Sequence, residues 1–97
     1  MIAGLSEEQR KFLLRTIHGY FPDAEILVFG SRLTGKNKPA SDLDLCLKSA
    51  SALELAKWGR LEEEISGSDI PFKVDLVDWH RISEEFRGII VSSSRGL

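Results

Sequence analysis

Cysteine is nearly absent from this sequence, which has only Cys46 in 97 residues. A single thiol excludes an internal disulfide and a cysteine-rich zinc site, and it fits a reducing compartment. An excess of basic residues is also missing, because the formal net charge is −2 at pH 7. The chain as a whole therefore lacks the positive surface of a general nucleic-acid-binding protein. We expect no direct nucleic-acid partner, and any site for an anion must be local.

Long apolar runs are missing as well, since the run at residues 25–30, EILVFG, is far too short to span a membrane. The first residues show no basic stretch followed by an apolar core, so we expect no secretory signal. With 42% hydrophobic and 29% charged residues, the composition is that of a folded soluble domain. We therefore expect one cytoplasmic domain over residues 1–97, without membrane contact. Its small core would gain from a partner subunit.

Hydrophobic periodicity predicts the order helix, strand, turn, strand, helix, strand, helix. Ser6 and Gln9 have the spacing of a capping box, which predicts the start of the first helix. The two later helices are expected to begin at caps on Ser51 and Ser83, with Ile89 among the inward-facing residues of the last one. The expected strands span residues 25–29, 42–47 and 73–78.

Together these elements predict an α+β fold, in which a small mixed β-sheet has the helices on one face and acidic side chains on the other. Residues 42–47, DLDLCL, alternate strictly, so their leucines point to one face and Asp42 and Asp44 to the other. The polar C-terminal residues 92–97 are expected to fray.

Two carboxylates at positions i and i+2 of a strand point the same way and repel each other, as Asp42 and Asp44 would. A protein tolerates this cost where a divalent cation lies between the acids. Oxygen ligands suit Mg²⁺, and two such ions can bind the attacking and leaving oxygens of an in-line displacement. Asp75, in the next expected strand, is the candidate third ligand and the base that takes a proton from an incoming hydroxyl.

Upstream of these acids, Gly30 and Ser31 follow directly on an expected strand, in a loop that could include one helical turn after Gly30. Glycine lets the backbone approach a phosphate closely, and the serine hydroxyl can bind a triphosphate. Arg32 and Lys36 add local positive charge in an otherwise acidic chain. These four residues are therefore the candidate nucleotide-phosphate site.

Taken singly, each of these patterns has a simpler interpretation. A Gly-Ser pair is more often a turn than a phosphate site, and an Asp-x-Asp pair is more often a solvated strand face. An aspartate in mid-strand is as often an edge residue as a ligand. The combination, a Gly-Ser turn, then Asp-x-Asp, then an acid in the next strand, favours a functional site.

This combination resembles the nucleotidyltransferase fold related to DNA polymerase β, where a Gly-Ser turn, an Asp-x-Asp pair and a later acid build the active site. The resemblance implies that Gly30 and Ser31 hold the nucleotide phosphates. It also implies that Asp42, Asp44 and Asp75 bind magnesium, with Asp75 as the base. The matching segments are GSRLTGKNKPASDLDL at residues 30–45 and KVDLVD at residues 73–78.

The short chain is similar in length to the minimal nucleotidyltransferases that are encoded as antitoxins beside HEPN-domain toxins. That resemblance implies a hetero-oligomer with a HEPN-type toxin. It also implies transfer of AMP from ATP to a tyrosine hydroxyl of the toxin, which neutralises it. Two alternatives stay open: a non-catalytic nucleotide-binding antitoxin that blocks its partner by contact, and an enzyme acting on a small molecule or an RNA end. All three acids are present, which favours catalysis.

Overall fold

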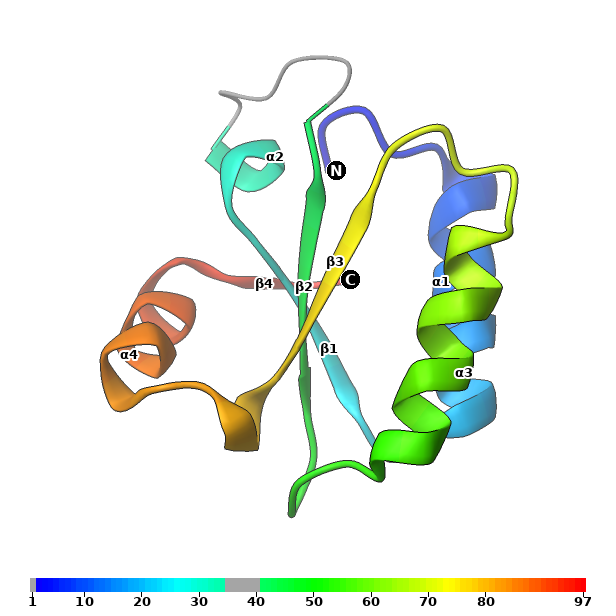
Figure 1. Cartoon of the computed structure of the whole chain (residues 1–97). Coiled ribbons are helices and arrows are strands. Elements are labelled where there is room, and N and C mark those ends of the chain that lie inside the picture. The colour runs from blue at the N-terminus through cyan, green and yellow to red at the C-terminus, as the bar shows by residue number, and fades with distance from the viewer. Residues whose placement is uncertain (1, 35–40) are drawn as a thin grey trace.

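The computed structural model describes residues 2–34 and 41–97, and within them a mixed four-stranded sheet lies between helices (Figure 1). The strand order is β3-β2-β1-β4; β2 and β3 are parallel, and β1 is antiparallel to both β2 and β4. The expected α+β class is confirmed. The helices are α1 (Glu7–Tyr20), α2 (Ser31–Thr34), α3 (Leu55–Ser66) and α4 (Glu84–Ser93), with a short 3₁₀ turn at Trp79–Arg81. The strands are β1 (Glu25–Phe29), β2 (Leu43–Lys48), β3 (Val74–Asp78) and β4 (Arg95–Gly96).

The main core lies between the sheet and helices α1 and α3, which pack side by side over one face (Figure 1). Helix α1 begins as predicted, because the Gln9 N–H donates to Ser6 Oγ at 3.1 Å and the Ser6 N–H donates to Gln9 Oε1 at 2.9 Å. Helices in the described ranges are all too short or too polar to cross a membrane. The fully buried residues of this core are Leu13, Ile17, Val28, Leu43, Leu45, Leu47 and Leu61.

The connection from β2 to α3 differs from the prediction, because α3 begins at Leu55 and no cap forms at Ser51. Leu53 is buried in the core, and its N–H donates to the buried carboxylate of Asp78 at 2.8 Å. The guanidinium of Arg81 lies 3.3 Å from the same carboxylate and donates to the Leu53 carbonyl at 3.0 Å. These bonds hold the β2–α3 connection against the end of β3, so α3 begins only after Leu53.

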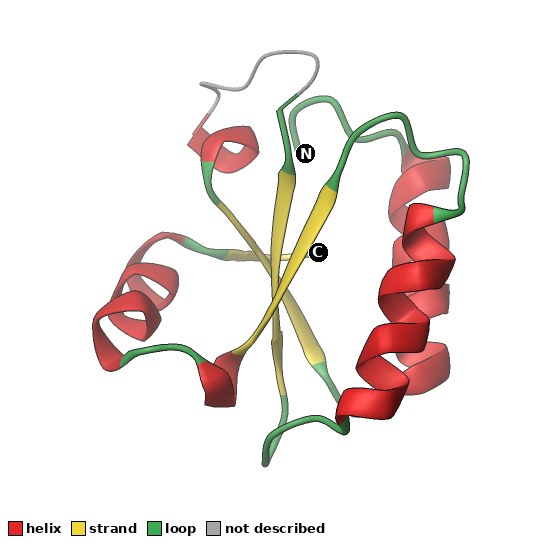
Figure 2. Cartoon of the chain, in the orientation of Figure 1, coloured by secondary structure: helices red, strands yellow, loops and turns green. Residues whose placement is uncertain are grey.

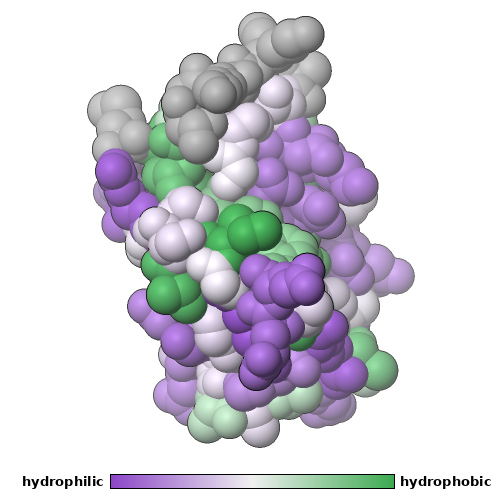
Figure 3. All heavy atoms as spheres, turned by 90° about the vertical axis from the view of Figure 1, so that its left-hand side faces the viewer, coloured by the Kyte–Doolittle hydropathy of each residue, from purple (hydrophilic) through white to green (hydrophobic). Residues whose placement is uncertain are grey.

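Helix α4 is an exception to the prediction that the helices share one face, because it lies across the sheet from α1 and α3 (Figure 2). The rings of Phe86 and Phe29 meet edge-on with centroids 5.4 Å apart, and Phe29 points away from the core side of β1, where Val28 lies. Ile90 is buried here, whereas Ile89, for which the periodicity predicts burial, is 59% exposed. Figure 3 looks onto this side, where apolar patches lie among hydrophilic residues.

The C-terminal residues form a strand, and the prediction that they fray is wrong. β4 pairs with β1, and the Leu97 N–H donates to the Ile26 carbonyl at 2.9 Å. Arg10 Nε donates to the Leu97 carbonyl at 2.6 Å. Backbone hydrogen bonding to β1 therefore orders a segment whose side chains are mostly small and polar.

Cys46 provides a test of this packing, because it is fully buried in β2 and burial raises the pKa of its thiol to about 11. The thiolate is the nucleophile, so a raised pKa leaves almost no reactive form near neutral pH. At about pH 8, we expect iodoacetamide to label the native protein at least about tenfold more slowly than the urea-unfolded protein. Mass spectrometry measures this at the single cysteine, and equal rates in the two states would contradict the buried placement.

Candidate active site

Two of the expected acids face each other across neighbouring strands. Asp44 and Asp75 are register partners in the parallel pair of β2 and β3, so their side chains project from the same face. Neighbouring strands lie about 4.8 Å apart, which puts the carboxylates within reach of one another. Asp42 is exposed and lies immediately before β2. The structure therefore brings together the three acids that the sequence pattern singles out.

The charges of these acids act on one another. Burial raises the pKa of Asp44, and the charges of Asp75 and Asp42 raise it further. The positive charge of Lys73 lowers it, without cancelling the other effects. Asp44 therefore lies in the field of both other acids, and the ionised cluster is under like-charge repulsion.

Gly30 lets the backbone after β1 come close to Asp44. Its φ of +85° lies in the region that L side chains rarely adopt. A Cβ at this position would also collide with Oδ2 of Asp44. The β1–β2 register causes this approach, since Phe29, the residue before Gly30, pairs with Asp44. Ser31 follows as the first residue of α2, so the expected phosphate turn stands beside the acids.

Arg32, which the sequence suggests as a phosphate ligand, has a structural role instead. Arg32 is only 3% exposed, and its guanidinium donates to the carbonyls of Ala3 at 3.0 Å and Ser41 at 2.6 Å. The guanidinium also lies 4.1 Å from the centroid of the Phe72 ring. The expectation for Arg32 is therefore revised, because Nη1 and Nη2 donate to backbone carbonyls in the interior. The other basic candidate, Lys36, lies outside the described residues.

The chemistry of the acids suits magnesium, although they do not form a closed cage. In the described part of the chain, no group of three or more His, Cys, Asp or Glu is arranged as a metal site. Asp44 and Asp75 nevertheless present hard oxygen donors on adjacent strands, with Asp42 beside them. A cation would relieve the repulsion among them. Such a donor set fits an ion that shares its shell with substrate phosphates and water.

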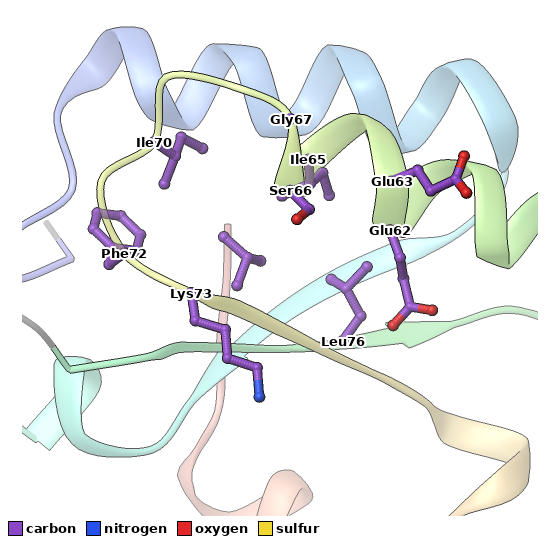
Figure 4. A pocket seen from close by; sticks show the side chains of 10 residues that line it. Glu62, Glu63, Ile65, Ser66, Gly67, Ile70, Phe72, Lys73 and Leu76 are labelled. Carbon is purple, nitrogen blue, oxygen red and sulfur yellow. The ribbon is translucent and has the colours of Figure 1, made fainter.

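Lys73 is a residue of this site that the sequence analysis does not single out. It is exposed, it lies directly before β3, and by strand alternation it shares the face of Asp75. The spacing of two residues before Asp75 is the signal that could have found it. Figure 4 shows its side chain leaving β3 on the side away from α3. The hollow in that view lies between α3 and β3, and its lining includes Ile70, Phe72 and Lys73 itself.

Comparison with known proteins adds to this geometry. The family described as Polymerase beta, Nucleotidyltransferase matches residues 17–97, a range that includes all of the site residues named above. Over 86 residues the chain is 41% identical to the Haemophilus influenzae protein named Probable protein adenylyltransferase MntA. That alignment covers 89% of this chain and 75% of the relative.

Solved structures show the same arrangement of elements. A crystal structure of a toxin–antitoxin with AMP-PNP has a TM-score of 0.74 and 27% identity, over 95% of this chain and 72% of that chain. A toxin–antitoxin MntA–HpeT structure has a TM-score of 0.71 and 29% identity, over 96% and 72% of the two chains. A minimal nucleotidyltransferase structure, at 22% identity and a TM-score of 0.71 over 94% of each chain, supports the fold alone.

Gly30→Ala tests the close approach of the turn to Asp44. Both the positive φ and the collision with the carboxylate should destabilise the variant, by at least about 1 kcal/mol. The control is Gly59→Ala in α3, where a Cβ would meet nothing within 4 Å, and where alanine should stabilise the helix by about 0.5–1 kcal/mol. Urea unfolding measures both changes. A Gly30→Ala protein as stable as the wild type would show that the glycine is not required.

Proposed function

This chain belongs to the polymerase β nucleotidyltransferase family, and we propose that it is an antitoxin that transfers AMP from ATP to a hydroxyl of a HEPN-type toxin. The observation that carries the proposal is the pairing of Asp44 with Asp75 beside the Gly30 turn. The similarity to an adenylyltransferase and to toxin–antitoxin structures, one of them with AMP-PNP, supports the reaction and the kind of partner.

The proposed reaction is an in-line displacement at the α-phosphorus of ATP. The oxygen of the acceptor hydroxyl, which we propose to be a tyrosine of the toxin, forms a bond to the α-phosphorus. The bond from that phosphorus to the bridging oxygen breaks, and pyrophosphate leaves with the electron pair. The hydroxyl proton passes to Asp75, which is exposed on the face where the acceptor arrives.

The remaining residues of the site bind and orient the nucleotide in this proposal. The turn at Gly30 and Ser31 holds the triphosphate, because glycine allows the close backbone approach that a phosphate needs. Asp42, Asp44 and Asp75 would hold two Mg²⁺ ions, which when bound supply positive charge against the phosphates. We place this activity in the cytoplasm, without a role for nucleic acid or membrane. The modified toxin and the antitoxin would form a hetero-oligomer.

Transfer of label tests the proposal directly. The purified chain is incubated with Mg²⁺, α-labelled ATP and the HEPN-type toxin encoded beside it, and the toxin is then examined by gel and mass spectrometry. We expect covalent AMP on a tyrosine of the toxin, together with loss of toxicity. Rescue of growth without label on the toxin would instead support an antitoxin that acts by contact alone. The absence of both label and rescue would contradict both interpretations, the enzymatic antitoxin and the contact-only antitoxin.

Asp75→Asn tests the role of the base. Asp75 is exposed, so the isosteric amide should leave the fold intact, but it cannot accept the proton and it binds magnesium poorly. We expect single-turnover AMP transfer to slow by at least about a hundredfold. The matched control is Asp69→Asn, at an exposed acid in the connection between α3 and β3, which should transfer at the wild-type rate. Near-normal transfer by Asp75→Asn would remove Asp75 from the site.

A further inference from the structure

Lys73 occupies a fixed place at the edge of the acid cluster. Its backbone carbonyl accepts from the Leu43 N–H at 2.9 Å, which ties the start of β3 to the start of β2. Strand β3 is one of the two edge strands of the described sheet, so no further strand covers Lys73 from that side. Its side chain turns away from α3 (Figure 4), toward the face that Asp75 shares.

The ammonium group of Lys73 is close enough to influence the pKa of Asp44 but forms no ion pair with a described residue. Its charge lowers the pKa of Asp44, against the larger opposing effects of burial, Asp75 and Asp42. No carboxylate oxygen of a described residue lies within 4.0 Å of its nitrogen. Among the described residues, Lys73 is therefore a cation beside the three acids that no carboxylate pairs, and it remains available to an anionic substrate.

The order of the groups across the sheet shows which part of the substrate Lys73 meets. Gly30 follows β1, Asp44 lies on β2 and Asp75 on β3, so Lys73 stands at the side opposite the Gly30 turn. If the turn holds the outer phosphates, as the proposed function has it, the reacting phosphorus lies between Asp44 and Asp75. Lys73 then approaches that phosphoryl group from the acceptor's side.

We propose that Lys73 is a catalytic residue whose ammonium contacts the oxygens of the reacting α-phosphoryl group. The inference rests on the proposed function. As the acceptor oxygen bonds to the α-phosphorus and pyrophosphate departs, negative charge is spread over the phosphoryl oxygens. A cation placed at these oxygens stabilises the transition state more than the bound ATP. Lys73 should therefore affect the rate of transfer more than the affinity for nucleotide.

The test compares Lys73→Ala and Lys73→Arg with the wild type. We expect Lys73→Ala to lower kcat for AMP transfer by about a hundredfold, while its affinity for ATP with Mg²⁺, measured by calorimetry without the toxin, falls less than about threefold. Lys73→Arg keeps the charge and should recover most of the rate. Lys11→Ala removes another exposed lysine, from α1 on the other face of the sheet, and should leave both quantities unchanged.

Two results would contradict the catalytic role of Lys73 and leave the proposed function intact. One is a normal kcat in Lys73→Ala with a lower urea midpoint, which would mean that the lysine only balances the acids of the resting protein. The other is a loss of ATP affinity as large as the loss of rate, which would place Lys73 on the bound triphosphate. Absence of ATP binding and transfer in the wild type would instead contradict the proposed function, and the catalytic role with it.

Discussion

The repulsion between Asp44 and Asp75, held opposite each other on parallel strands, is the constraint on which the rest of this site depends. Like charges on one sheet face lower stability unless a cation or a proton neutralises them. Burial, and after it the charges of Asp75 and Asp42, raise the pKa of Asp44, so repulsion contributes to the cost of ionising this acid. A small domain keeps such a pair where the ligand that relieves the repulsion is part of its function.

The fold holds the acids in place through the opposite face of the same strands. Leu43 and Leu45, on either side of Asp44, are fully buried against α1 and α3. A slip of one residue in β2 would bury the acid and expose the leucines, so the core fixes the register of the site. Arg32 adds a second restraint, because it binds the carbonyl of Ser41, just before the acid pair. The turn at Gly30 then packs directly against the acid.

The strands and the acids could be predicted because local patterns determine them: DLDLCL alternates with period two, and KVDLVD follows one helix later. Long-range contacts determine what could not be predicted. Asp78 binds Leu53 across the sheet end and thereby delays α3. Pairing with β1 orders the residues around Arg95, and burial turns Arg32 inward. Lys73 differs from these, because its position two residues before Asp75 is a local signal that places both side chains on one face.

The central claim is that the acids are strained until nucleotide and metal bind together, and thermal unfolding tests it most directly. ATP with Mg²⁺ should raise the Tm of the wild type by roughly 5 °C or more, beyond the sum of their separate effects. Asp44→Asn, which removes the repelling charge, should melt no lower than the wild type without ligand and should lose the cooperative rise. An equal rise in Asp44→Asn, or the full rise with ATP alone, would contradict this account.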